Sequence, residues 1–196
     1  LPPQGRAASP LFQHIASSLE PTTGRAAILC PHGVLFRKEE SALRRKLIES
    51  DLLECVLGLG AGLFYNSPME AVVITLRANK VPDRRGKVLF INAIKDFARE
   101  RAQSFLREIH RDKILNAYRA FTEQPGFATV ADLESIAGND YSLAMPLYVA
   151  RPTDSSGSGR LDVDLESAVL DWRSAESAAD IAIRHVISLL RREAKS

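Results

Sequence analysis

Four short apolar runs constrain the fold of this chain more than any other feature. They cover residues 26–30, 52–59, 71–76 and 88–91, and turn residues or charged residues bound each of them. Runs of this length predict strands rather than helices, and the third is rich in β-branched side chains. The first run is continuously apolar, so we expect a strand buried on both faces, as in a parallel sheet covered by helices.

The connections between these runs predict how the strands pair. Residues 39–50 read as a helix, with Leu43, Leu47 and Ile48 on its inner face, so the first two strands should form a right-handed parallel crossover. About a dozen residues separate the second and third strands, which leaves no room for a helix and favours antiparallel pairing. Residues 11–19 read as a further short helix. The sum is an α/β sheet with an antiparallel strand at one side.

The second half of the chain carries helical and linker patterns. Residues 96–121 are dense in charge and predict one long helix, whereas the pattern of apolar residues over 123–149 is short and broken. A Ser-Gly-rich stretch follows. Beyond it, apolar residues step by fours and threes and predict a coiled-coil-like helix that needs a partner: Leu165, Val169, Trp172, Ala179, Ile183, Val186 and Leu190. We therefore divide the chain into a partial sheet (1–93), a helical extension (94–150), a flexible linker (151–160) and an interaction helix (161–196).

Composition excludes several classes of protein. The 196 residues carry a formal net charge of +2, too balanced to indicate nucleic-acid binding by itself. Cys30 and Cys55 lie in apolar runs and read as buried thiols in a reducing compartment. The four histidines have no ligand spacing, so we expect no metal site. No apolar run reaches the length of a membrane span and no signal peptide is visible, so we expect a cytoplasmic protein without membrane contact.

A first candidate site is the loop Pro31-His32-Gly33, which follows the first strand at the edge where α/β sheets place their ligands. His32 could carry a proton or contact a base. The alternative, that it caps the strand and hydrogen-bonds the loop, is favoured by the residues alone. Arg37 and Lys38 follow this loop and are candidate DNA contacts, whereas the other basic residues read mostly as a solvated surface.

A second candidate is Phe64 with Tyr65, in the glycine-rich loop after the second strand. Enzymes that modify a base in duplex DNA flip it out of the helix and hold it, often against an aromatic ring. The alternative, favoured by the residues alone, is that Phe64 folds back into the core. Gly58, Gly60 and Gly62 alternate in this region, but they open no helix and do not form a dinucleotide-binding fingerprint.

Several segments, taken in order, resemble the C-terminal half of the modification (M) subunit of type I restriction–modification systems, an adenine-N6 DNA methyltransferase. These segments are Pro31-His32-Gly33-Val34-Leu35-Phe36, Gly62-Leu63-Phe64-Tyr65, Lys87-Val88-Leu89-Phe90-Ile91-Asn92-Ala93, and Asn139-Asp140-Tyr141 with Pro146 and Tyr148. Glu70-Ala71 stands where the family has Pro-Thr. The family's glycine-rich cofactor loop and its Asn-Pro-Pro-Phe/Tyr motif occur nowhere in this chain.

The resemblance implies a fold and a set of roles. The fold would be the C-terminal half of a Rossmann-like methyltransferase sheet with an antiparallel hairpin, plus C-terminal helices. Phe64 would stack on the flipped adenine, and the C-terminal helix would dock on the specificity (S) subunit. S-adenosylmethionine, DNA and the restriction (R) subunit would belong to the complete complex, and this chain alone would be inactive.

Two alternatives stay open. The chain could be a non-catalytic assembly module that binds partner subunits through the stripe between Leu165 and Leu190, or self-associates through it. It could also be an unrelated small α/β enzyme that uses His32, although no nucleophile or acid partner is visible near this residue in the sequence.

Overall fold

The apolar runs form strands of one five-stranded sheet in the computed structural model, which describes residues 8–64, 67–100 and 103–149. Four of the strands agree with the runs that the sequence singles out, and the fifth lies in the segment that reads as broken. The strands are β1 (Arg25–Pro31), β2 (Leu53–Leu59), β3 (Ala71–Arg77), β4 (Lys87–Ala93) and β7 (Ala128–Asp132).

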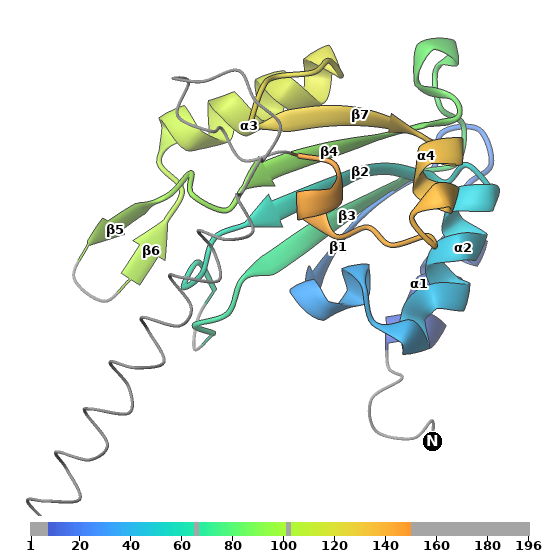
Figure 1. The fold of residues 1–196 in the computed structure, drawn as a ribbon, viewed down its shortest axis with the longest axis horizontal. Coiled ribbons are helices and arrows are strands. Elements are labelled where there is room, and N and C mark those ends of the chain that lie inside the picture. Colours follow the sequence, from blue (N-terminus) through green and yellow to red (C-terminus); the bar gives the residue numbers. More distant parts are fainter. Residues whose placement is uncertain (1–7, 65–66, 101–102, 150–196) are drawn as a thin grey trace, which may run out of the picture. The chain divides into compact units, whose positions relative to one another are not determined.

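The strand order is β1-β3-β2-β4-β7, and Figure 1 labels these five strands. Strand β3 is antiparallel to both β1 and β2, whereas β2 and β4 are parallel. The predicted hairpin of β2 and β3 is therefore confirmed. The prediction that the antiparallel strand lies at one side is wrong, because β3 enters between β1 and β2 and separates these two parallel strands.

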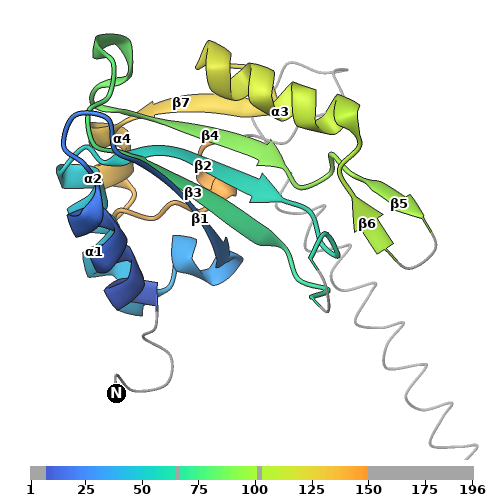
Figure 2. The same cartoon turned by 180° about the vertical axis from the view of Figure 1, so that it is seen from behind.

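One face of the sheet is covered by three helices: α1 (Ala8–Ser18), α2 (Ser41–Glu49) and α4 (Leu133–Gly138) (Figures 1 and 2). Their apolar sides bury a core that includes Phe12, Leu47, Ile136 and Phe90, each at most 5% exposed. Tyr148 stacks on Phe90 with ring centroids 3.9 Å apart. This stacking secures the last described segment of the chain against the sheet.

The opposite face is covered by α3 (Glu108–Ala120), which buries Ile114 and Ala117 against Leu89 and Ile91 of β4. No helix among the described residues covers β1 on this side, and Leu29 is 51% exposed. The expectation that β1 is buried on both faces is therefore wrong. β1 is an edge strand with one buried face, whereas the central β2 is buried along nearly its whole length.

The long helix predicted over 96–121 exists only in its second half. Residues before it form a two-stranded hairpin, β5 (Ala98–Glu100) and β6 (Gln103–Phe105). The helix begins after Arg107, whose backbone N–H donates to His110 Nδ1, and it ends at Phe121 in a left-handed conformation. Within α3, Ile114 and Ala117 are buried against the sheet. Phe97 and Ser104 instead pack against the glycine-rich loop described below.

The described residues belong to one compact unit within residues 1–153. Strand β7 lies beyond the predicted boundary at residue 93 and pairs with β4, so this later part of the chain helps to complete the sheet. The division into a partial sheet and a helical extension stays a prediction. The predicted linker (151–160) and interaction helix (161–196) lie outside the described residues.

Candidate functional site

Three loops leave the sheet side by side at the end where the parallel strands finish, which is called the carboxyl edge below. Pro31 pairs with Ala71, Ala71 pairs with Leu59, and Leu59 pairs with Ala93, so these four residues form one row across β1, β3, β2 and β4. The chain leaves this row into the His32 loop, the glycine-rich loop and the segment that leads to β5. This is the carboxyl edge of the parallel strands, where open α/β sheets bind ligands.

Phe64 lies in the glycine-rich loop that follows β2. Gly62 has a φ of +74°, a conformation that other residues adopt only with strain, and the Ser67 N–H donates to the Phe64 carbonyl oxygen at 3.1 Å. The Phe64 ring is half-buried beside the core that α3 covers. It is neither enclosed in the core nor fully exposed, so part of its surface remains available to another planar group.

The base of this loop packs closely against the segment after β4. A Cβ atom on Gly60 would lie 2.5 Å from the Ile94 carbonyl oxygen and 2.5 Å from Cδ1 of Phe97. Only glycine fits such a close approach of two backbones. Further along, the Ser104 N–H donates to the Gly62 carbonyl oxygen at 3.3 Å. The β5–β6 hairpin therefore supports the loop that carries Phe64, a role that the helical reading of this segment missed.

The Pro31-His32-Gly33 loop continues as a 3-10 helix over His32–Leu35. His32 Nε2 is buried and has no hydrogen-bond partner among the described residues, and the His32 ring meets the Phe36 ring edge-on at 5.8 Å. Phe36 is 50% exposed. The Phe36 and His32 rings thus lie together at the carboxyl end of β1, and His32 Nε2 has no hydrogen-bond partner in the described part of the chain.

Arg37 and Lys38, the predicted DNA contacts, are both exposed. The Arg37 guanidinium folds back over the loop, since a Cβ atom on Gly33 would lie 2.5 Å from its Nε. Lys38 begins the 3-10 helix Lys38–Glu40. Both cations therefore lie beside the His32 loop, although Arg37 is held against backbone rather than extended into solvent.

Arg44 has a structural role that the sequence does not reveal. Its guanidinium is buried and donates to the carbonyl oxygens of Val34, Arg37 and Tyr141, at 3.1, 2.8 and 2.9 Å. Burial lowers the pKa of this guanidinium, and the nearby Glu40 carboxylate opposes the shift. Arg44 holds the His32 loop to the segment at Tyr141. Its spacing of three and four from Leu47 and Ile48 places it on the inner side of α2, but this spacing does not identify its hydrogen-bond partners.

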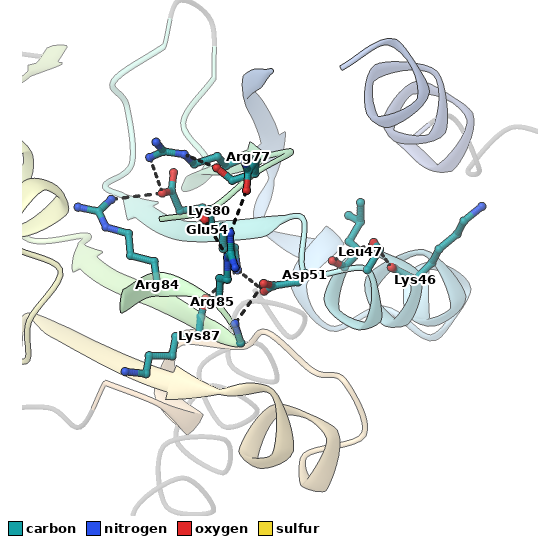
Figure 3. Close-up of polar contacts among 12 residues, drawn as sticks. Lys46, Leu47, Asp51, Glu54, Arg77, Lys80, Arg84, Arg85 and Lys87 are labelled. Carbon is teal, nitrogen blue, oxygen red and sulfur yellow. Dashed lines mark hydrogen bonds and ion pairs between the residues drawn. The ribbon is translucent and has the colours of Figure 1, made fainter. Parts of the chain in front are cut away.

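A second charged cluster lies at the opposite end of the sheet (Figure 3). The buried carboxylate of Glu54 accepts hydrogen bonds from Arg77 and Arg84, each at 3.2 Å. Nearby, the buried Lys80 ammonium binds Asp51 at 2.6 Å. Arg84 therefore belongs to an internal ion-pair network. This network accounts for the position of its side chain, so no contact with a DNA phosphate is needed to explain it.

A pocket of about 350 Å³ opens on the sheet face beside α3. Its lining is largely apolar and includes Ala27, Cys55, Leu57 and Ile114, with Tyr118 at one side. Its lining runs from Ala27, near the amino end of β1, to Leu57 and Ile91, which lie two residues before Leu59 and Ala93 of the row. Burial raises the pKa of the Cys55 thiol strongly, which keeps it protonated and unreactive.

Gly58 and Gly60 both pack closely against neighbouring residues. A Cβ atom on Gly58 would lie 3.3 Å from side-chain atoms of Ile94 and Met145, whereas one on Gly60 would collide with Ile94 and Phe97. In the described part of the chain, no group of three His, Cys, Asp or Glu side chains is placed to hold a metal ion. There is also no helix in that part long and apolar enough to span a bilayer.

Several predicted site residues lie outside the described residues. They are Tyr65, the candidate DNA contact next to Phe64, and the predicted partner-binding stripe of Leu165, Val169, Trp172, Ile183, Val186 and Leu190. Of the remaining candidates, the structure brings the His32 loop, Arg37, Lys38 and the Phe64 loop to the same edge.

Comparison with known proteins decides the family. The family model for N-6 DNA methylases matches residues 1–156. The chain belongs to the N-6 DNA methylase family. It is 36% identical over 133 residues to the type I restriction enzyme MjaVIII methylase subunit of Methanocaldococcus jannaschii, an alignment that covers 66% of this chain and 23% of that protein. It is 34% identical over 175 residues to the MjaVII methylase subunit of the same organism, covering 85% and 30%.

Solved structures give the same fold. The methyltransferase subunit of a type I restriction–modification system from Streptococcus thermophilus matches with a TM-score of 0.67 and 33% identity, covering 74% of this chain and 33% of that one. The EcoKI M protein matches with a TM-score of 0.60 at 16% identity. The predicted resemblance and fold class are thereby confirmed. The chain spans less than a third of the length of the two curated relatives above.

Proposed function

We propose that this chain is the part of a type I M subunit that supplies the base-holding edge of an adenine-N6 DNA methyltransferase. In the complete complex, the enzyme would transfer a methyl group from S-adenosylmethionine to adenine in DNA. The observation that carries the proposal is the row Pro31–Ala71–Leu59–Ala93, which brings the His32 loop and the Phe64 loop to one edge of a methyltransferase-like sheet. Family membership supports the assignment of chemistry.

In this proposal Phe64 stacks on the flipped adenine. The half-buried ring is fixed on one side by the core and by the turn that Ser67 closes, so its free surface meets the base with little loss of conformational entropy. Stacking on an aromatic ring holds a base without reading its hydrogen-bonding edge. Phe64 thus positions the adenine, whereas other parts of the complete enzyme supply the groups that react.

The loop Pro31-His32-Gly33 forms the neighbouring wall of the base-binding edge. His32 Nε2 is buried and has no protein partner in the described part of the chain, so a small shift of the loop would be needed for it to hydrogen-bond a base or sugar. Arg37, Lys38 and Tyr65 contact the DNA backbone around this edge. Arg37 also packs on Gly33, so it positions the loop in addition to carrying charge.

We further propose that the isolated chain neither binds S-adenosylmethionine nor methylates DNA. The chain contains no glycine-rich loop of the cofactor-binding kind and no Asn-Pro-Pro-Phe/Tyr motif. Strand β1 pairs only with β3 among the described residues and exposes Leu29. An edge strand of this kind readily pairs with a further strand, so β1 is where the rest of the catalytic domain would join the sheet.

Calorimetric titration with S-adenosylmethionine tests whether the cofactor site lies outside this chain. The isolated chain should give no binding heat at micromolar concentrations, whereas a complete M subunit that contains this segment should bind. Micromolar binding by the isolated chain would overturn this proposal and would show that the segment contains a cofactor site of its own.

The proposed partners are DNA and the S and R subunits of the same system, in the cytoplasm. The apolar stripe between Leu165 and Leu190 would bind a helix of the S subunit, or a second copy of the chain when that subunit is absent. If this stripe were the chain's only function, as in the assembly-module alternative, changes at Phe64 would leave methylation by the complete complex unaffected.

A further inference from the structure

The β5–β6 hairpin extends from the sheet at the same end as the Phe64 loop (Figure 1). In this hairpin Arg99 pairs directly with Ser104. Directly paired residues of an antiparallel ladder have their side chains on the same face. Ser104 is buried against the Phe64 loop, because its hydroxyl oxygen lies 3.1 Å from the position of a Cβ atom on Gly62. The Arg99 side chain is therefore on the hairpin face that borders this loop.

Among the described residues, no acidic neighbour neutralises the positive charge of Arg99. Glu100, the adjacent acid, is on the other face of the hairpin and binds Arg107 at 2.9 Å. Asp96, the next acid along the chain, binds Lys113 of α3. Within the described residues Arg99 forms no ion pair and its side chain is exposed. An exposed guanidinium without an ion-pair partner in the described part of the chain thus lies on the hairpin face that borders the loop carrying the proposed base-stacking ring.

We propose that Arg99 binds the DNA phosphate that flanks the flipped adenine. This inference rests on the proposed function, because it assumes that the base stacks on Phe64. Flipping rotates the nucleotide about its own backbone, so the flanking phosphates stay close to the base while their surroundings change. A guanidinium can form two parallel hydrogen bonds to a phosphate and so fixes the orientation of that phosphate.

The hairpin also links phosphate binding to the position of the ring. Its backbone is joined to the Phe64 loop through the hydrogen bond from Ser104 N–H to the Gly62 carbonyl oxygen, and Phe97 packs on Gly60 at the base of that loop. Because Arg99 and Ser104 are paired, a phosphate bound at Arg99 would restrain the hairpin and the loop together. Arg99 should therefore affect both DNA affinity and the stability of the flipped state.

The test uses the complete modification enzyme that contains this segment, with its S subunit, and compares Arg99→Ala, Arg99→Lys and a control. Lys46→Ala is the matched control, because Lys46 is also exposed but lies near the far end of α2. DNA dissociation constants are measured over a range of salt concentrations. A duplex with 2-aminopurine at the target position reports flipping by its fluorescence.

Arg99→Ala should weaken DNA binding about tenfold, near the lower end of the contribution of a hydrogen bond to a charged group. It should also reduce the slope of log affinity against log salt concentration by about 1, as expected for one lost phosphate contact. The 2-aminopurine fluorescence at saturating DNA should fall. Arg99→Lys should keep the salt slope but recover the fluorescence only in part, and Lys46→Ala should match the wild type.

An unchanged salt slope and unchanged fluorescence for Arg99→Ala would overturn the inference. So would a loss of S-subunit binding in the absence of DNA, since that would make Arg99 a protein contact. Failure of the stacking proposal would be seen separately. Phe64→Ala would then leave methylation unchanged, whatever the salt slope of the Arg99 variants.

Discussion

Tyr118 donates a 2.6 Å hydrogen bond to the carboxylate of Glu54. Glu54 lies near the start of β2 and its side chain has no exposed surface, whereas Tyr118 lies in the last turn of α3. The contact joins two elements that are 64 residues apart in the sequence. Together with Arg77 and Arg84 it satisfies a buried charge at the end of the sheet opposite the candidate site.

Removing the tyrosine hydroxyl should destabilise the fold. Tyr118→Phe leaves one oxygen of the buried carboxylate without its hydrogen bond, which should lower the free energy of unfolding by about 1–3 kcal/mol. Tyr141→Phe is the matched control, because the Tyr141 hydroxyl also binds a glutamate, Glu49, but on the surface at 3.1 Å. The control should cost less than about 0.5 kcal/mol. Urea unfolding of the three proteins provides the comparison, and equal losses would contradict this reading of Glu54.

Stability should fall in acid partly through Glu54. Burial by itself raises the pKa of this carboxyl, but hydrogen bonds from Tyr118 and Arg77 outweigh burial and hold the pKa below its ordinary value of 4.5. A carboxyl with a lowered pKa stabilises the fold above its ordinary pKa, and this contribution is lost as the pH falls through the lower pKa of the folded state. The unfolding free energy should therefore decrease below about pH 4.5.

The variant Glu54→Gln isolates this contribution from those of other acids such as Glu20, whose pKa is lowered to about 2 by hydrogen bonds from Thr22 and Thr23. The variant should be less stable than the wild type at pH 7, and the difference between the two should shrink in acid. A difference that stays constant from pH 7 to pH 2 would show that Glu54 does not titrate as argued.

The sequence predicted those elements whose signal is local. Four strands were recognised because each is a continuous apolar run, and α2 because Leu43 and Leu47 repeat at helical spacing. The sequence does not predict the placement of β3 between β1 and β2, since strand order depends on pairing between distant segments. It predicts helix over the β5–β6 hairpin, because the dense charge there gives no alternation of apolar and polar residues.

The candidate site could be predicted only in part, because its motifs are local whereas its contacts join distant segments. The His32 loop and the Phe64 loop were recognised from motifs, and their common position in the sheet follows from strand pairing. The roles of Arg44 and Ser104 were missed, because their partners Tyr141 and Gly62 are far away in the sequence. A buried arginine has the same local signature as an exposed one until its partners are known.

The close packing at Gly60 predicts that any side chain at this position would displace the Phe64 loop. In Gly60→Ala the new Cβ atom would collide with the Ile94 carbonyl oxygen and the Phe97 ring, so the loop must move. We expect a loss of about 1–3 kcal/mol in stability and reduced methylation by the complete enzyme. Gly138→Ala, with no atom within 4 Å of the new Cβ, should leave methylation unchanged. Thermal unfolding and a methyl-transfer assay measure the two effects, and wild-type behaviour of Gly60→Ala would refute the proposed contact.

The predicted interaction helix gives a prediction about assembly. Ile183→Asp would place an unpaired carboxylate in the apolar stripe and should therefore disrupt binding to the S subunit, or self-association in its absence. Ser188→Asp adds the same charge away from the stripe and should be neutral. Light scattering with and without the S subunit distinguishes the variants. Equal assembly of both with the wild type would remove the case for an interaction helix.

The most direct test of the central claim is methyl transfer per folded molecule by a complete enzyme that carries Phe64→Ala. Stacking on an aromatic ring contributes about 1–3 kcal/mol per base, so the rate should fall by about 5- to 150-fold. The melting temperature should change little, and Phe64→Tyr, which keeps the ring, should retain most of the activity. A Phe that only filled the core would instead cost about 3–5 kcal/mol of stability. A large drop in melting temperature with unchanged methyl transfer per folded molecule would contradict the account.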